Sequence, residues 1–279
     1  IPVPLAGPRL PHDMAFTKNY AIVNDMPLYW NPELLERNLH VVQFHPDQKT
    51  RFGLIPRHGQ TQDIRWFEAA PTYVLHWTNA WEEGDEVILE GYHQAKPMPD
   101  PLEDMGRYSH MMAYVDEHSF QSRLHRWRFN LKTCHTTEKR LDDRILEFGM
   151  FNQRYATRPY RYAYSAVQVP GWFLFNGYVK HDLQTGQSWS IQLPDGQYAS
   201  EAPFAPRTNA QDEDDGYLVS FITNENTQRS EIILIDSKKF EAGPVCRIEL
   251  PHKLCSGTHA CWASGADMQT GGLLSGQPG

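Results

Sequence analysis

The sequence has few cysteines and no long apolar segment. Four cysteines among 279 residues are too few for a disulfide framework, so we expect reduced thiols in a cytoplasmic protein. No run of about 18 apolar residues is present, which argues against a helix that spans a bilayer. Acidic residues outnumber basic ones, 34 to 26, and the net charge is −8. The chain therefore lacks the basic field that binding to nucleic acid requires.

Helical periodicity is also scarce. The one candidate helix covers residues 31–38, where Asn31 and Pro32 suit an N-cap and a first helical position. Elsewhere, short apolar or alternating runs are bounded by Asp, Asn, Gly and Pro, which is the pattern of β-strands. The predicted strands are residues 20–25, 40–45, 73–77, 86–92, 126–131, 160–165, 171–180, 216–223, 231–236 and 246–250.

Three segments repeat one arrangement, which is a strand, a polar turn opened by Asn or Asp, and a second strand. The turn residues are Asn130, Asp182 and Asp236, whose numbers differ by 52 and 54. A period of about 50 residues built of short antiparallel strands is typical of a β-propeller. At about 50 residues per blade, the chain would supply five or six blades of an all-β fold. Three unrelated hairpins in a β-sandwich are the alternative.

Two segments do not fit this pattern of blades. Residues 93–106 are rich in Pro and Met and are expected to form a long loop. Residues 264–279 are rich in Gly and are expected to form a flexible tail. No linker divides the chain, so we expect a single propeller domain over residues 1–279.

Three of the 13 histidines lie in apolar surroundings, where a charged imidazolium would be costly. They are His12, His259 and His76, which ends the predicted strand 73–77. A neutral imidazole is the form that binds a metal ion, and a propeller would bring distant residues to a common axis. An all-imidazole site suits iron, zinc, copper or nickel. Taken singly, each histidine also fits a buried core residue with one hydrogen bond.

Five stretches, in family order, resemble the carotenoid cleavage oxygenases, a family that includes stilbene-cleaving dioxygenases. The stretches are "PRLPHDMAFTKNYAIVNDMPLYW" (8–30), "RFGLIPRHG" (51–59) followed by "IRWFEAAPTYVLHWTNAWEEGDEVIL" (64–89), "RILEFGMFNQRYATRPYRYAYS" (144–165), "ASEAPFAPRTNAQDEDDGYLVSF" (199–221) and "LPHKLCSGTHACW" (250–262).

The resemblance implies a seven-bladed β-propeller that holds a non-haem Fe(II) through histidines. Three of the ligands would be His12, His76 and His259. It further implies that the carboxylate of Glu147 holds the ring of His76 and that of Glu201 holds the ring of His259. A carboxylate that accepts the outer N–H of an imidazole fixes its tautomer and raises its basicity as a ligand.

The implied reaction is cleavage of a C=C bond in a hydrophobic conjugated alkene by O₂, with two carbonyl products. The substrate would be a carotenoid, an apocarotenoid or a stilbene-like compound, in a tunnel lined by Phe16, Trp77 and Trp262. A carotenoid would imply peripheral membrane contact, for which residues 97–105 are the candidate patch, although their acidic residues oppose deep insertion. Two other hypotheses remain, a non-catalytic propeller that binds partners and a zinc hydrolase that uses the same histidines.

The sequence departs from the family pattern at three places. The family's remaining histidine ligand lies upstream of the one that matches His12, and the chain begins "IPVPLAG" without an initiator Met. We therefore expect an N-terminally incomplete propeller, or an inactive fragment that lacks one ligand. Gly149-Met150 stands where Pro-Arg is common, and Ala260 follows His259 where Gly is common.

Overall fold

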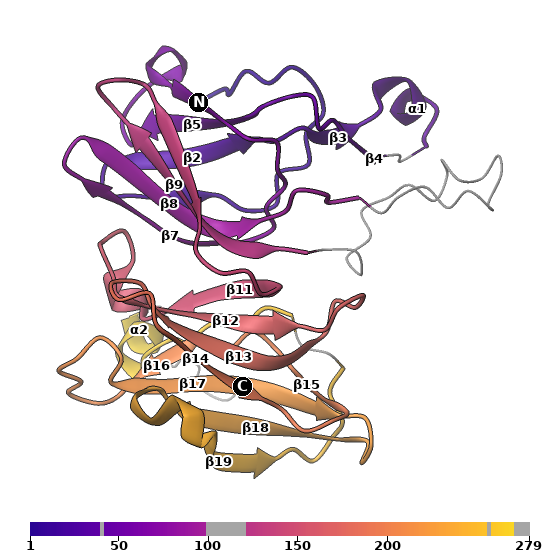
Figure 1. Ribbon diagram of the computed structural model, residues 1–279, viewed down its shortest axis with the longest axis vertical. Helices are drawn as coiled ribbons and strands as arrows, with labels where there is room; N and C mark the ends of the chain where they lie inside the picture. Colours follow the sequence, from indigo (N-terminus) through magenta and orange to yellow (C-terminus); the bar gives the residue numbers. More distant parts are fainter. Residues whose placement is uncertain (40–41, 99–120, 256–257, 271–279) are drawn as a thin grey trace, which may run out of the picture.

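The computed structural model describes residues 1–39, 42–98, 121–255 and 258–270, and antiparallel strands dominate this part (Figure 1). The first blade consists of β1 (Ala15–Phe16), β2 (Tyr20–Asp25), β5 (Thr50–Pro56) and β6 (Arg65–Ala69). The second consists of β7 (Trp77–Glu83), β8 (Glu86–His93), β9 (Arg123–Asn130) and β10 (Thr136–Arg140). The third consists of β11 (Leu146–Phe151), β12 (Tyr162–Gln168), β13 (Phe175–Asp182) and β14 (Ser188–Gln192). The fourth consists of β16 (Phe204–Pro206), β17 (Gly216–Asn224), β18 (Arg229–Asp236) and β19 (Pro244–Glu249).

These four-stranded units confirm the predicted all-β fold made of blades. The described residues form four blades rather than the predicted five or six, because insertions lengthen the first two. Between β2 and β5 lie β3 (Leu28–Trp30), α1 (Pro32–Glu36) and β4 (Val42–Phe44). The connection from β8 to β9 is also long. A short strand, β15 (Gln197–Ala199), pairs with both β13 and β17 and joins the last two blades into one sheet.

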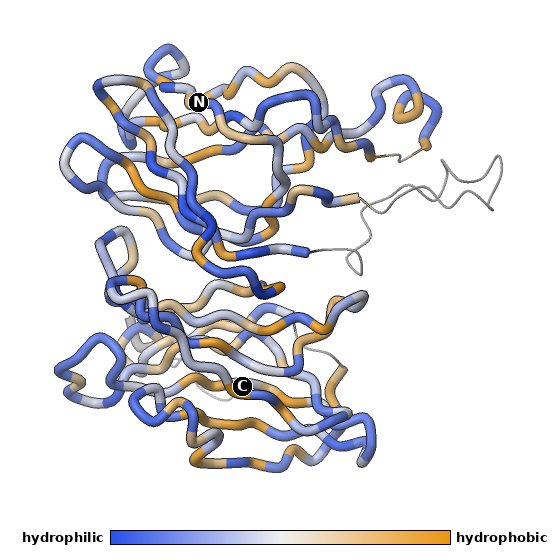
Figure 2. The backbone as a smooth tube through the Cα atoms, in the orientation of Figure 1, coloured by the Kyte–Doolittle hydropathy of each residue, from blue (hydrophilic) through white to orange (hydrophobic). Residues whose placement is uncertain are grey.

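Neighbouring blades pack through aromatic cores. Phe52 of the first blade lies 5.7 Å from Trp127 and 5.1 Å from Phe129 of the second, measured between ring centres. Phe204 stacks on Tyr164 at 5.7 Å between the third and fourth blades. Hydrophilic residues gather at the peripheral turns, while apolar residues run along the strands (Figure 2). Burial of large aromatic side chains between sheets is therefore a main stabilising term of this fold.

The predicted polar turns are confirmed by their hydrogen bonds. In each turn the side-chain oxygen of the opening Asn or Asp accepts the backbone N–H two residues later, which fixes the local bend. The three bonds run from Lys132 to Asn130 at 3.0 Å, from Gln184 to Asp182 at 3.1 Å and from Lys238 to Asp236 at 3.0 Å. The predicted helix also has its expected start, because Asn31 accepts the N–H of Leu34 at 3.1 Å.

The predicted strand 73–77 is wrong, and this changes the setting of His76. Tyr73 makes only an isolated bridge to Gln94, and the strand begins at Trp77. The backbone N–H of Val74 meets the sulfur of Met26 instead of a ladder carbonyl. The apolar side chains here fill the core from an irregular segment, so His76 precedes a strand rather than ending one.

Other boundaries shift by a few residues. The strand predicted at 171–180 begins only at Phe175, because residues 169–172 form a turn closed by a bond from the Trp172 N–H to the Val169 carbonyl. Of the expected tail 264–279, Gly265–Thr270 form the short helix α2, whose first turn is capped by a hydrogen bond from the Asp267 N–H to Ser264 Oγ.

Part of the expected tail (271–279) and most of the candidate membrane patch (99–105) lie outside the described residues. Within the described ranges, no helix is long and apolar enough to cross a membrane.

Candidate metal centre

The predicted site residues come from all four blades and meet where the first strands of the blades adjoin. His12 precedes β1, His76 directly precedes β7, Glu147 lies in β11, and Glu201 lies between β15 and β16. Strand β7 contacts both β1 and β11, which places β7 and β11 face to face at the middle of Figure 1. Residues far apart in sequence are thereby gathered at one place, as expected of a propeller.

Three imidazoles form the centre of this cluster. One ring nitrogen each from His12, His76 and His259 lies within 4.8 Å of the others. The ring of His76 is close to both of the others, with its ring centre 5.1 Å from that of His12 and 4.9 Å from that of His259, and its plane is nearly perpendicular to each. The group is made of imidazoles alone, a donor set that suits zinc, copper, iron or nickel.

His76 is oriented by a completely buried carboxylate. Its Nδ1 lies 2.7 Å from Oε2 of Glu147, which has no exposed surface and also accepts the N–H of Phe148 at 2.8 Å. An ionised carboxylate only accepts hydrogen bonds, so opposite an ionised Glu147 it is Nδ1 that would carry the proton. The Nε2 of His76 is left buried without a hydrogen-bond partner among the described residues. An orphaned imidazole nitrogen that faces two other rings fits a metal ligand.

The pKa directions of two histidines differ. Burial, together with the neighbouring His76, lowers the pKa of His12, which agrees with the neutral ring expected there. Burial alone would also lower the pKa of His76, but the charge and the hydrogen bond of Glu147 outweigh it and raise that pKa. The expectation of a neutral ring from apolar surroundings is therefore incomplete for His76, because it took no account of the carboxylate behind it.

His259 is held more loosely than His76. It lies in an irregular segment after β19, and its side chain is 59% exposed. Its Nδ1 lies 3.2 Å from Oε2 of Glu201, which also accepts the N–H of Ala260 at 2.8 Å. The segment is tied back to the fourth blade by a hydrogen bond from the N–H of Leu254 to Ser230 Oγ.

Asp13 links the segment of His12 to the segment of His76 by a hydrogen bond. The sequence alone did not identify this residue. Its Oδ2 accepts the backbone N–H of Trp77 at 3.0 Å, and its carbonyl accepts the side-chain amide of Asn24 at 2.9 Å. The residue after His12 is thus bonded to the residue after His76. Its place beside a candidate ligand was the available sequence signal.

A β-bulge in β11 places Glu147. Pairing with β12 slips by one residue between Glu147 and Met150. Phe148 there has a φ of 54° and is buried, an unusual backbone for a bulky side chain. Its ring lies 5.0 Å from the ring of His76 and 5.6 Å from that of His259. Strain of this kind persists where packing fixes the backbone, often at functional sites.

Gly149 accounts for one departure from the family pattern. A Cβ at this position would lie 2.2 Å from Oγ1 of Thr78 and 3.0 Å from its Cα. Thr78 belongs to β7, which begins directly after His76, and Gly149 belongs to β11, which carries Glu147. Only a glycine lets these two strands approach so closely here.

We therefore expect Gly149→Ala to separate β7 from β11. Overpacking of this kind costs about 1–3 kcal/mol of the free energy of unfolding, and we expect weaker metal binding as well. Thermal denaturation and metal titration of the variant would measure both effects. Gly84→Ala is the control for the loss of a glycine, because a Cβ at Gly84 meets nothing within 4 Å, although its positive φ adds a small cost. Equal metal affinity in Gly149→Ala and the wild type would contradict this account.

Two cavities adjoin the histidines, and two of the three predicted lining residues lie in their walls. One cavity includes His12, His76, His259 and Trp77 in its wall, and its neighbour includes Trp262. Each has a volume of about 290 Å³, and they share Gly149 and Glu201.

The third predicted lining residue, Phe16, borders neither of these two cavities. Its side chain is 43% exposed, and the guanidinium of Arg57 stands 5.5 Å from its ring centre. Alternation along β1 explains the difference, since Ala15 takes the buried position and Phe16 the opposite face.

Residues 1–264 match the protein family described as retinal pigment epithelial membrane protein. The chain is 35% identical over 286 residues to a carotenoid 9,10(9′,10′)-cleavage dioxygenase of Crocus sativus, an alignment that covers 96% of this chain and 51% of that protein. It is 30% identical over 266 residues to an isoeugenol monooxygenase of Pseudomonas putida, covering 91% of this chain and 54% of that protein.

Solved structures are similar over the same extent. Lignostilbene dioxygenase of Pseudomonas brassicacearum superposes with a TM-score of 0.78 and 26% identity, over 91% of this chain and 55% of that one. A cobalt-substituted apocarotenoid oxygenase of Synechocystis has a TM-score of 0.76 and 25% identity, over 89% of this chain and 52% of that one. The chain spans about half the length of the curated relatives it matches.

Proposed function

The chain belongs to the carotenoid cleavage oxygenase family, and on this premise we propose that the complete protein is a non-haem Fe(II) dioxygenase. It would cleave a C=C bond of a conjugated alkene with one O₂ and release two carbonyl compounds, so that each product receives one oxygen atom. The carrying observation is the cluster of His12, His76 and His259 with ring nitrogens within 4.8 Å. Fe(II), when bound, supplies the redox chemistry with O₂.

The protein residues position and tune this centre. We propose that Glu147 and Glu201 accept the Nδ1 protons of His76 and His259, which leaves the opposite ring nitrogens free to bind the metal. Trp77 and Trp262 would offer apolar walls to a flat substrate. The metal ligand that the family has upstream of the His12 position would come from the rest of the complete protein.

The names of the relatives indicate two substrate classes. One group is named for carotenoid cleavage and another for isoeugenol oxidation, so we propose a carotenoid, an apocarotenoid or a stilbene-like alkene. All four cysteines are free and exposed, which supports a reducing, cytoplasmic location. Peripheral membrane contact would accompany a carotenoid substrate.

Metal analysis and oxygen uptake test this proposal on the complete protein. We expect about one iron per chain, and one O₂ consumed per alkene cleaved with either an apocarotenoid or a hydroxylated stilbene. A protein free of metal would favour a non-catalytic propeller. Zinc in place of iron, with ester hydrolysis and no oxygen uptake, would favour a hydrolase.

A variant of Trp262 tests the substrate wall. We expect Trp262→Ala to lower kcat/KM about tenfold, since it removes most of the apolar area of one indole, while the iron content stays unchanged. Trp77 is a poorer choice because it is almost fully buried and packs on Phe52 in the core. Phe16→Ala is the matched control, and we expect it to be fully active. An unchanged kcat/KM in Trp262→Ala would remove this residue from the substrate site.

A further inference from the structure

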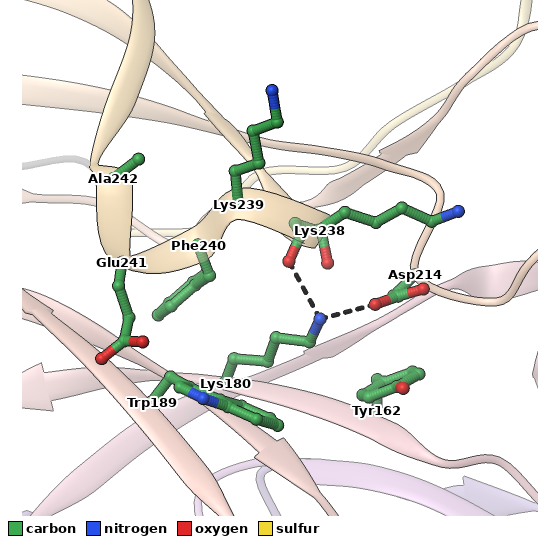
Figure 3. Close-up of a pocket in the computed structure, with 10 residues that line it drawn as sticks. Tyr162, Lys180, Trp189, Asp214, Lys238, Lys239, Phe240, Glu241 and Ala242 are labelled. Atoms are coloured by element: carbon green, nitrogen blue, oxygen red, sulfur yellow. Dashed lines mark hydrogen bonds and ion pairs between the residues drawn. The ribbon is translucent and has the colours of Figure 1, made fainter.

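A separate cavity of about 450 Å³ lies between the third and fourth blades (Figure 3). None of its lining residues borders the two cavities beside the histidines. Its volume falls within the range of about 300–1,000 Å³ that small-molecule sites have. The lining comes from β12, β13, β14, the residue Asp214 and the 3₁₀ segment η5 (Ser237–Ala242).

A buried lysine forms the floor of this cavity. The Nζ of Lys180 donates to Oδ2 of Asp214 at 2.7 Å and to the carbonyl of Ser237 at 2.9 Å, as the dashed lines in Figure 3 mark. An ammonium has three donors, so one N–H has no polar partner within the described part of the chain. The same nitrogen lies 4.3 Å from the ring centre of Tyr162 and 5.6 Å from that of Trp189.

The aromatic side chains in the wall of the cavity carry further polar groups that a ligand can bond to. No hydrogen bond engages the hydroxyl of Tyr162 or the indole N–H of Trp189 among the described residues, and both side chains are partly exposed. The ring of Phe240 is buried beside them and adds apolar surface. The cavity therefore combines flat apolar walls with several unused donors close to one buried positive charge.

The position of Lys180, and not the net charge of the lining, favours an anion over a cation. The lining has three lysines and two acidic residues, Asp214 and Glu241, and Asp212 outside it pairs with Lys238 at 2.5 Å, so the charges balance. A cationic ligand would meet Lys180 already placed beside both aromatic rings. Glu241 lies on the other side of the opening from Asp214 (Figure 3), so a ligand with two anionic groups would be repelled at that end.

We propose that this cavity binds a small aromatic monocarboxylate. Its carboxylate would accept hydrogen bonds from Lys180 and Tyr162, and its ring would pack on Trp189. A charge-assisted hydrogen bond to a buried ammonium is stronger than one in water, and aromatic pairs add attraction beyond their buried area. The site is independent of the metal centre and of the proposed oxygenase reaction.

Calorimetric titration of the complete protein with 4-hydroxybenzoate tests the proposal. We expect a dissociation constant below about 1 mM and binding at least about tenfold weaker for 4-hydroxybenzamide, which lacks the charge. Trp189→Ala should weaken binding of the acid about three- to tenfold. Trp172→Ala, which truncates an exposed indole outside the cavity, is the matched control and should bind normally.

The role of charge is tested by changing the ligand from acid to amide and not by replacing Lys180. Lys180→Met would leave the carboxylate of Asp214 without its partner and could unfold the blade. A second protein variant, Lys239→Glu, alters the exposed rim and should weaken binding, while Lys139→Glu on β10 should not. Binding must also persist in His76→Ala. Absence of heat with 4-hydroxybenzoate, equal binding of acid and amide, unchanged binding in Trp189→Ala, or loss of binding in His76→Ala would each overturn the proposal.

Discussion

Replacing His76 by alanine should remove the metal from the complete protein and abolish alkene cleavage. The ring of His76 lies close to both other rings, and its unpaired Nε2 is buried in the cluster, so its loss would take away the best-oriented of the proposed ligands. Even groups that only support ligands change metal affinity about 10–100-fold, and we expect a larger effect here. The variant should keep a circular dichroism spectrum rich in β-structure.

The variant also leaves the buried carboxylate of Glu147 without its partner, which costs about 1–3 kcal/mol of stability. His181→Ala is the matched control for that cost. His181 is a buried histidine of β13 whose Nε2 lies 2.8 Å from Oδ2 of Asp142. We expect the control to lose stability but to keep its iron and its activity. Full activity with bound iron in His76→Ala would refute the assignment of this ligand.

Local chemistry made the turns and most strands predictable. An Asn or Asp that opens a turn bonds to the backbone two residues later, so Asn130, Asp182 and Asp236 act through contacts that are close in sequence. The prediction of a strand at 73–77 was wrong because apolar side chains indicate that a segment is buried, and not that its backbone pairs with another strand. Whether the backbone joins a ladder there depends on Met26, which is distant in sequence.

The candidate site was predictable only because motifs of this sequence resemble those of the family. His12 and His259 lie in irregular segments, where no periodicity shows which way a side chain points. The bulge at Phe148 depends on the pairing of β11 with β12, and the hydrogen bond from Trp77 to Asp13 depends on how the first two blades approach each other. The cavity at Lys180 likewise needs three strands and a 3₁₀ segment to exist. Such features come from tertiary packing, which a single sequence does not display.

The two carboxylates that we propose as supports of the metal ligands should differ in importance, because they differ in burial. Glu147 has no exposed surface and lies 2.7 Å from His76, whereas the side chain of Glu201 is 18% exposed and lies 3.2 Å from His259. A charge-assisted hydrogen bond is stronger where water is excluded, because the local dielectric constant is low. We therefore expect Glu147→Gln to weaken metal binding about 10–100-fold, and Glu201→Gln to weaken it severalfold less.

The measurement is a competition titration of iron against a coloured chelator for both variants of the complete protein. Glu90→Gln is the matched control. It shows how much of the effect comes from replacing a buried carboxylate and how much from losing the contact with His76. Glu90 is equally buried but bonds to Arg126 and Tyr160. Its replacement leaves Arg126 without a charged partner, so stability should fall while iron affinity is unchanged. Equal losses of iron affinity in Glu147→Gln and Glu201→Gln would contradict this account. Burial of the carboxylate would then not determine how much its hydrogen bond to the histidine contributes to metal binding.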